Sequence, residues 1–589
     1  MEKYPQWQLG DLYRNIDDPQ IERDFQKVKK QVQNFNQKFR GKIGEETSAK
    51  EILSGIILCE KIKRDADKIA NFAYLSFCTN NDKAEYGSFW QKQLNGNIEI
   101  ANSLLFFDLE LSGLSDEKLN SLMNSSSLKN YKNYIHNILS WKPHRLSEKE
   151  EKIINSKKAV GSLAFVRLFE QQHSKKEYIF SLEGKKEKLN QSQILSKLYS
   201  SEKKERKRAF EVMTAGLADN VDLSAYVYNM IIQDKRDDDC LMGFVLPEES
   251  RHKENEIEKS SVDAMISVIT ENYSIVGDFY KHKSELIGVR KFFDYDRYAP
   301  LEKSKKRIVF SQAEKIILKS FGKFSSEFQK RASDFFEKKW IDFDPRRGKN
   351  GGAFCDYVTP DLHPFILVNY DGDIREVLIL AHELGHGVHA MFARKQTYFN
   401  FDWPLTIAET ASTFGELLVF DFLKEKMKTK NQKVSLYSTM IERIFSTVFR
   451  QNAMFLFERD VFDLAKKKGE LSVEDFNVIW RKRQGEMFGD SIELTKNYDI
   501  WWSYIPHFIR TPFYVYAYSF GELLSLSLYA KYKKDGDSFV EKYIKILESG
   551  GSQSPQELFA TLEIDLSNKE FWENGMELVR ELVEEFRKL

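Results

Sequence analysis

The stretch VLILAHELGHGVHA, Val377 to Ala390, holds three of the ten histidines of the chain, and a glutamate directly follows the first of them. Apolar residues recur in and just after this stretch at steps of three and four positions: Val377, Leu380, Ala381, Leu384, Val388 and Met391. This period predicts a helix with one buried face. Asp373 is a good N-cap for that helix, and Glu376 three residues later can complete a capping-box-like start.

A second face of the predicted helix carries the polar residues of the motif. His382 and His386 are four positions apart, so their side chains point the same way. Two imidazoles one turn apart can bind a single zinc ion, and Glu383 can reach a water on that metal. The alternative is a core helix whose histidines are satisfied by neighbouring polar groups. The capping residues and the regular period favour the metal site.

A catalytic zinc site needs a third protein ligand and an open position. The acidic candidates downstream of the histidines are Asp402, Glu409 and Glu416. The segment TIAETASTFGELLVFDFL, Thr406 to Leu423, is predicted to form a second helix. Glu409 and Glu416 are seven positions apart, so they would share one face of it. Residue spacing alone leaves both roles open, since either glutamate could ligate the metal while the other orients a histidine.

Composition excludes several classes of protein. The 589 residues include 89 basic and 89 acidic residues, and this balance gives no electrostatic reason to expect nucleic acid or an anionic membrane as a partner. No apolar run is long enough for a membrane span, and the N-terminus has no signal-peptide pattern. Four scattered cysteines form no C-x-x-C pair, which indicates reduced thiols and a cytoplasmic protein.

The chain is rich in segments with helical spacing, so we predict a mainly α fold. The segment YIFSLEGKK, residues 178–186, is predicted to form a short hairpin. The segments GGAFCDYV (351–358) and FILVNYDG (365–372) are β-prone and directly precede the metal motif, so a small sheet is expected beside its helix. We divide the chain near residue 200, into an N-terminal helical domain (1–200) and a catalytic domain (201–589).

The motif and its surroundings resemble the oligoendopeptidase F branch of the thimet oligopeptidase-like zinc metallopeptidases. The resemblance is carried by HELGH followed by IAETAS, and by motifs in the same order along most of the chain: WQLGDLYRNIDDPQIERD, PHRLSEKEE, GKNGGAFC and IPHFIRTPFYVYAYSFGELL. It implies one Zn²⁺ per chain, held by His382, His386 and Glu409, with Glu416 in a supporting role. It also implies an elongated, two-lobed helical molecule whose deep central channel admits short, unfolded peptides.

The resemblance implies further site residues. A histidine and tyrosines of HFIRTPFYVYAYSF stabilise the transition state in the family, which indicates His507 with Tyr518 and then Tyr514. On a helix Tyr516 would point away from these two tyrosines, and we expect it among the substrate-binding residues. Packing in the core is the alternative for such a tyrosine-rich segment. The family assigns His389 no ligand role, so it is expected beside the site.

A peptide-binding strand is expected just before the metal helix. Gly351, Gly352, Ala353 and Phe354 are predicted to hydrogen-bond the substrate backbone by strand addition, because the glycines permit close approach. A purely structural strand is the alternative.

The expected activity is zinc-dependent hydrolysis of internal bonds in short peptides, with Glu383 as the proton acceptor. Two alternatives are a zinc carboxypeptidase of related helical fold and an inactive helical peptide-binding protein. Residue patterns do not indicate an oligomeric state.

Overall fold

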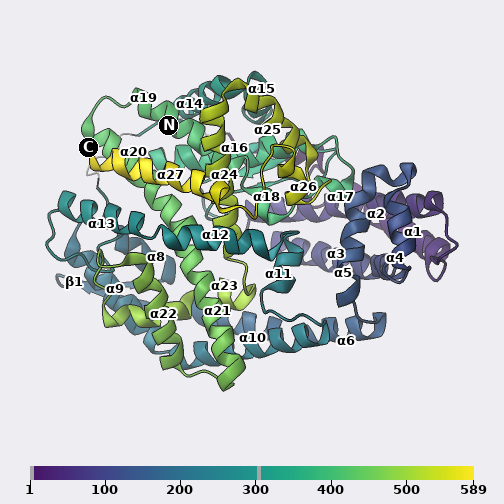
Figure 1. Cartoon of the computed structure of the whole chain (residues 1–589), viewed down its shortest axis with the longest axis horizontal. Helices are drawn as coiled ribbons and strands as arrows, with labels where there is room; N and C mark the ends of the chain where they lie inside the picture. The colour runs from purple at the N-terminus through teal and green to yellow at the C-terminus, as the bar shows by residue number, and fades with distance from the viewer. Residues whose placement is uncertain (1–4, 302–306) are drawn as a thin grey trace. The chain divides into compact units, whose positions relative to one another are not determined.

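A computed structural model describes residues 5–301 and 307–589 of the chain. These residues are mainly α-helical, as predicted, with one two-stranded and one three-stranded sheet (Figure 1). They form two compact units, each built from three separate stretches of the chain. Unit 1 lies within residues 5–148, 307–426 and 531–565, and unit 2 within 149–301, 427–530 and 566–589. Residue 200, where the sequence is divided above, lies within unit 2.

Unit 1 contains the metal motif. Its helices are α1 (Pro19–Phe39), α2 (Ala49–Cys78), α3 (Ala84–Ser112), α4 (Asp116–Met123), α5 (Lys132–Trp141), α14 (Phe310–Phe324), α15 (Ser326–Glu337), α16 (Ile374–Ala393), α17 (Tyr398–Phe401), α18 (Leu405–Ala408), α19 (Ser412–Lys426), α25 (Asp537–Ser549) and α26 (Pro555–Ala560). Its strands are β3 (Ile341–Asp342), β4 (Phe354–Asp356) and β5 (Phe365–Leu367).

Unit 2 is also helical. Its elements are α6 (Glu148–Lys158), α7 (Ser162–Ser174), β1 (Tyr178–Leu182), β2 (Lys185–Leu189), α8 (Gln191–Ser196), α9 (Lys203–Ala218), α10 (Val221–Leu241), α11 (Glu249–Glu254), α12 (Lys259–Glu271), α13 (Ser274–Leu286), α20 (Lys430–Ile444), a π-helical turn (Phe445–Phe449), α21 (Arg450–Lys468), α22 (Val473–Phe488), α23 (His507–Arg510), α24 (Tyr516–Asp535) and α27 (Lys569–Arg587). Helix α24 continues from unit 2 into unit 1. Strands β1 and β2 form the predicted hairpin.

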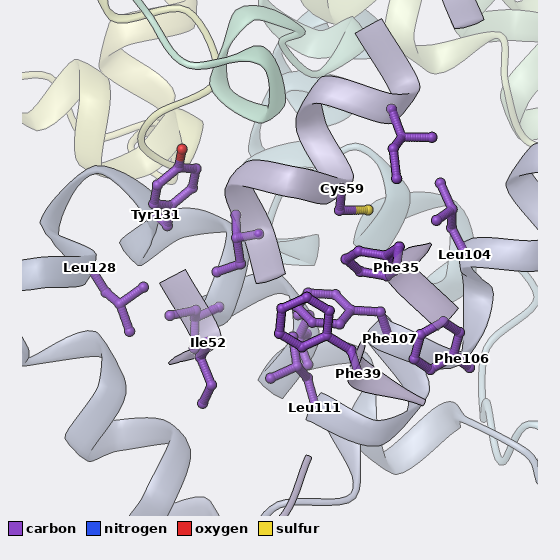
Figure 2. Close-up of a cluster of buried hydrophobic side chains, with 14 of the residues drawn as sticks. Phe35, Phe39, Ile52, Cys59, Leu104, Phe106, Phe107, Leu111, Leu128 and Tyr131 are labelled. Carbon is purple, nitrogen blue, oxygen red and sulfur yellow. The ribbon is translucent and has the colours of Figure 1, made fainter. Parts of the chain in front are cut away.

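The first three helices of unit 1 build an aromatic core, shown in Figure 2. Helix α1 presents Phe35 and Phe39 one turn apart, and the Phe35 ring lies 5.3 Å from that of Phe107 on α3. Ile52 and Cys59 of α2 complete the contact. Burial of each large apolar side chain stabilises the folded state by about 1.5–3 kcal/mol. This core fixes α2, which in turn supports the sheet.

The three-stranded sheet lies beside the helix that carries the metal motif, as predicted. The strand order is β3-β5-β4, with β3 parallel and β4 antiparallel to β5, and both β4 and β5 contact α16. Phe365 and Leu367 of β5 are fully buried and belong to one apolar cluster with Trp7 and with Phe72 of α2. The sheet therefore joins the N-terminal helices of unit 1 to α16.

Three segments differ from their predicted form. The strands expected over 351–358 and 365–372 are shortened to Phe354–Asp356 and Phe365–Leu367, so Gly351, Gly352 and Ala353 precede the first of them. The single helix expected over 406–423 is broken into α18 and α19, and Glu409 caps the first of them. Glu409 and Glu416 therefore do not share a face of one helix. Within the described ranges, no helix is both long and apolar enough to cross a membrane.

Candidate metal centre

Helix α16 begins where its sequence predicts. The side chain of Asp373 accepts a hydrogen bond from the backbone N–H of Arg375, and Glu376 reaches back to complete the capping box. The helix packs on α15 and α19, and the side chains of His382 and His386 are mostly but not fully covered. Glu383 is buried in the same turn. The capped start and the buried stripe together fix the direction of both imidazoles.

Three donor atoms converge at this helix. The Nε2 atoms of His382 and His386 are 3.2 Å apart, and Oε2 of Glu409 lies 3.3 Å from the first and 3.6 Å from the second. Ligands about 2.1 Å from a tetrahedral zinc ion are separated from one another by about 3.4 Å. The spacing and the two-nitrogen, one-oxygen donor set therefore fit a catalytic type of zinc site.

A break between two helices places Glu409 in this group. Helix α18 ends at Ala408, and Glu409 lies in the turn before α19. Ser412 donates a hydrogen bond of 2.6 Å to Oε2 of Glu409. Gly385 lets this turn approach α16, because a Cβ atom there would lie only 2.3 Å from the carbonyl oxygen of Ala411. Close helix packing, rather than helical period, thus brings this carboxylate to the histidines.

Glu416 contacts the other nitrogen of His382. It is completely buried on α19, and its Oε1 lies 2.6 Å from Nδ1 of His382. A carboxylate at Nδ1 orients the ring and directs Nε2 toward a metal. This is the contact expected of the supporting role that the resemblance assigns to Glu416.

Residue spacing did not reveal the partner of the second histidine. The hydroxyl of Tyr357 lies 3.3 Å from Nδ1 of His386, and burial raises the pKa of this tyrosine. Tyr357 directly follows β4, within the β-prone segment that precedes the motif. In the sequence, only its position after a short predicted strand pointed to a place near the metal motif.

His389 lies outside the donor group. It is buried, and its ring stacks on Trp403 at a centroid distance of 3.9 Å. Burial lowers the pKa of His389 to about 3, so the imidazole is neutral at physiological pH. Its structural position agrees with a packing role beside the site.

Strand β4 passes close to Glu383 and forms an edge of the sheet. Burial, followed by the nearby charge of Glu383, raises the pKa of Cys355 in the middle of this strand. Only the β5 side of β4 is paired among the described residues. A Cβ atom at Gly351 or Gly352 would meet nothing within 4 Å, so the approach to the strand is open.

In unit 2, three residues predicted to act on the transition state lie together. Nε2 of His507 lies 3.3 Å from the hydroxyl of Tyr518, and the Tyr518 ring lies 5.1 Å from that of Tyr514. His507 begins α23 and Tyr518 lies in the first turn of α24. Burial, helped by the charges of Arg450 and Arg510, lowers the pKa of His507.

Tyr516 has a different environment. It is completely buried, and its hydroxyl accepts a 2.8 Å hydrogen bond from the amide of Asn255 and lies 3.0 Å from Nδ1 of His252. A side chain enclosed in this way packs the core of unit 2. We therefore do not retain Tyr516 among the proposed substrate-binding residues.

The chain is thus a mainly helical protein in which the donor atoms of His382, His386 and Glu409 form a candidate catalytic metal centre. Family models agree: that of peptidase family M3 matches residues 196–578, and that of oligopeptidase F matches residues 110–176. The chain belongs to peptidase family M3 and is an enzyme. Membership in this metallopeptidase family implies a metal, and His382, His386 and Glu409 can hold it.

Curated relatives support the resemblance to the oligoendopeptidase F branch. The oligoendopeptidase F homolog of Borreliella burgdorferi is 28% identical over 549 residues, which cover 90% of each chain. Oligopeptidase PepF of Bacillus subtilis is 24% identical over 590 residues, covering 99% of this chain and 87% of the relative.

Solved structures share the fold. A crystal structure from Chlamydophila abortus has a TM-score of 0.86 at 23% identity, with 100% of this chain and 99% of the other covered. Oligoendopeptidase-F from Enterococcus faecium has a TM-score of 0.73 at 18% identity, with 97% and 98% covered.

Proposed function

We propose that this enzyme is a zinc-dependent oligoendopeptidase that hydrolyses internal bonds of short, unfolded peptides. The observation that carries the proposal is the convergence of two imidazole nitrogens and one carboxylate oxygen, 3.2 to 3.6 Å apart, beside the buried Glu383. Relatives named oligoendopeptidase F support the substrate class.

The proposed roles follow from the positions of the side chains. A bound Zn²⁺ would supply Lewis-acid chemistry, polarising the peptide carbonyl and lowering the pKa of water. Glu383 takes a proton from the attacking water and passes it to the leaving amine, a form of catalysis worth about 10²–10⁴-fold. Glu416 holds the ring of His382 in the orientation that presents Nε2.

Two further roles remain proposals about separate parts of the chain. The hydroxyl of Tyr518, followed by that of Tyr514, and His507 supply hydrogen-bond donors to the developing oxyanion. The segment from Gly351 to Phe354 leads into the edge of β4 that is unpaired in the described structure, and it pairs with the backbone of the peptide.

The division of the chain into residues 1–200 and 201–589 also stays a proposal, as a division into family regions of the sequence and not into parts that fold independently. Its support is that the two matching family models cover 110–176 and 196–578. A cytoplasmic location is proposed from the four cysteines, all of which are free thiols.

The decisive experiment replaces Glu383 with Gln. We expect peptide hydrolysis to fall by about 10²–10⁴-fold, while about one zinc ion per chain is retained because the three ligands are intact. Steady-state assays and metal analysis of the same sample provide both readouts. Full activity in Glu383→Gln would falsify the proposed proton acceptor.

A second assay separates endopeptidase from carboxypeptidase activity. The enzyme is incubated with peptides blocked at both ends, with and without a chelator, and the products are read by mass spectrometry. We expect internal cleavage that the chelator abolishes. Cleavage only of peptides with a free C-terminus would identify a carboxypeptidase, and no hydrolysis of any peptide would favour a binding protein.

A further inference from the structure

Unit 2 contains a cavity of about 110 Å³ that the proposed mechanism does not use. Polar side chains that line it include Tyr280, Arg297, Tyr298, Glu442, Ser446 and Arg450. A cavity needs about 10–15 Å³ for each enclosed water, so this one has room for a small polyatomic ligand. Two arginines, Arg297 and Arg450, line this small cavity, so the question is what balances their positive charges.

Neither guanidinium has an acidic partner among residues 5–301 and 307–589. Arg297 is 6% exposed; one terminal nitrogen donates a 2.9 Å hydrogen bond to the hydroxyl of Tyr498, and the other donates to the hydroxyl of Tyr298. Arg450 makes one long hydrogen bond, 3.4 Å, to the hydroxyl of Tyr504. The Nε of each arginine has no acceptor in the described part of the chain. Neutral phenols leave both positive charges uncompensated.

The carboxylate that lines the cavity is already neutralised. Oε1 of Glu442 lies 2.5 Å from Nζ of Lys283, whose side chain is completely buried. The nearby Asp296 pairs with Arg206 at 2.8 Å. No carboxylate among the described residues lies within ion-pair distance of Arg297 or Arg450. Burying unpaired charges is costly, so an arrangement of this kind is stabilised when an anion joins it.

A π-helical turn brings the lining residues to one face. Helix α20 ends at Ile444, the chain continues as a π-helix over Phe445–Phe449, and α21 begins at Arg450. Glu442, Ser446 and Arg450 therefore follow one another at steps of four and all reach the cavity. Such turns inside longer helices are frequent at functional sites.

We propose that this cavity is an oxyanion-binding site in which Arg297 and Arg450 hold a carboxylate or a phosphate. A planar guanidinium presents several N–H donors that match two oxygens of such an anion, and charge-assisted pairs of this kind are the strong ones. The Nε–H groups of both arginines, which have no acceptor in the described structure, can donate hydrogen bonds to the oxygens of the anion.

Two sources could supply the oxyanion. Ser519, which follows Tyr518, donates hydrogen bonds to the carbonyl oxygens of Thr447 and Val448 in the π-helical turn, so the cavity lined by this turn adjoins the segment proposed to act on the substrate. The source would then be a carboxylate of the peptide, and this half of the inference rests on the proposed function. A free inorganic anion is the other source, and it does not depend on that function.

Thermal unfolding and calorimetric titration with inorganic phosphate and with acetate, at constant ionic strength, test the site itself. We expect saturable binding and a rise in Tm for the wild type, and binding at least about tenfold weaker in Arg450→Gln. The control is Arg483→Gln in the same unit, whose guanidinium already pairs with Asp460 at 2.7 Å and should leave anion binding unchanged. Absence of binding to the wild type, or equal binding in Arg450→Gln, overturns the proposal.

Peptide pairs that differ only in a C-terminal carboxylate or amide identify the source. If the peptide supplies the oxyanion, the wild type should have a lower KM for the acid, and Arg450→Gln should lose this preference. Equal KM values together with phosphate or acetate binding assign the site to a free anion. If no peptide is hydrolysed, the proposed function fails, but the titration still decides the oxyanion site without any activity measurement. Should Arg450→Gln not fold, the wild-type titration and the acid–amide comparison remain decisive.

Discussion

At the scale of single residues, each ring nitrogen of His382 contacts a different carboxylate. Nε2 lies 3.3 Å from the partly exposed Glu409, whereas Nδ1 lies 2.6 Å from the completely buried Glu416. A carboxylate at Nδ1 fixes the orientation of the imidazole ring. The partly exposed Glu409 can complete a metal site with the two imidazoles.

Replacing Glu416 with Gln should weaken zinc affinity by about 10–100-fold. The amide keeps the size of the side chain but removes the negative charge that makes His382 a better ligand. Competition with a chromophoric chelator measures the change, and Glu425→Gln on the same helix is the control because Glu425 is 59% exposed and pairs with Lys323. Unchanged zinc affinity in Glu416→Gln would show that this residue only packs against His382.

Glu409→Ala is expected to lose more zinc than Glu416→Ala, because Glu409 supplies a donor atom of the site.

At the scale of elements, the contact between α16 and the start of α19 sets the spacing of the metal donors. Gly385 lies between the two histidines and faces the backbone of Ala411 and Ser412. A methyl group there would lie 2.5 Å from Cα of Ser412, and backbone atoms cannot rotate away as a flexible side chain can. The turn that holds Glu409 therefore depends on this glycine.

Gly385→Ala should destabilise unit 1 by about 1–3 kcal/mol, the usual cost of overpacking. It should also lower zinc content, because the turn that carries Glu409 must move away from α16. Denaturant unfolding and metal analysis check both effects. Gly485→Ala on α22 is the matched control: a Cβ there meets nothing within 4 Å, so the higher helix propensity of alanine should raise stability slightly. A Gly385→Ala protein with normal zinc content would contradict this account.

A second contact between elements holds the segment that carries Tyr514 and Tyr518. Oε1 of Glu458 on α21 accepts a 2.8 Å hydrogen bond from the backbone N–H of Phe513, which has a φ of 60°. Glu458 is fully buried, and its Oε2 has no partner in the described structure. Burial raises the pKa of Glu458 to about 8, so the carboxyl group is protonated at neutral pH.

This carboxyl group predicts a pH dependence of stability. Between its ordinary pKa of 4.5 and about 8, the folded chain binds a proton that the unfolded chain releases. The contribution of Glu458 is therefore fully present below pH 4.5 and is lost as pH rises, by at most about 1.4 kcal/mol per pH unit. In Glu458→Gln this loss should vanish. The free energy of unfolding of the variant, measured with urea, should therefore rise relative to that of the wild type from pH 5 to 8. A constant difference across that range would argue against the protonated form.

At the scale of the whole chain, neither compact unit is a continuous stretch of sequence. Unit 1 combines residues 5–148 with 307–426 and 531–565. Its sheet beside α16 rests on N-terminal side chains, since Trp7 and Phe72 share a buried cluster with Phe365 and Leu367. The metal helix is thus supported by residues about 300 positions earlier in the sequence.

A fragment of residues 201–589 should therefore not fold cooperatively by itself, because it exposes the apolar surface that the N-terminal helices cover. Circular dichroism melting and zinc content of the purified fragment check this expectation. Coexpression with residues 1–200 should restore both properties, and the full chain is the control. Cooperative melting with one bound zinc in the isolated fragment would instead establish 201–589 as an independent domain.

The parts of the candidate site that residue patterns predicted are local ones. Capping by Asp373, the period of α16 and the common face of His382 and His386 depend on residues within a turn or two of each other. The resemblance to a known family added Glu409 and the group of His507, Tyr514 and Tyr518. The buried position of Tyr516 did not follow from its spacing, because its neighbours Asn255 and His252 are about 260 residues away.

By itself, the sequence determined a mainly helical chain with H-E-x-x-H on a capped helix, because helix formation and the direction of side chains are set by nearby residues. Only the tertiary structure decided which carboxylate reaches which nitrogen of His382. The helical spacing of Glu409 and Glu416 predicted one shared face, but close packing at Gly385 accompanies a break between them. Contacts of this kind depend on the backbone of distant segments, which no local pattern records.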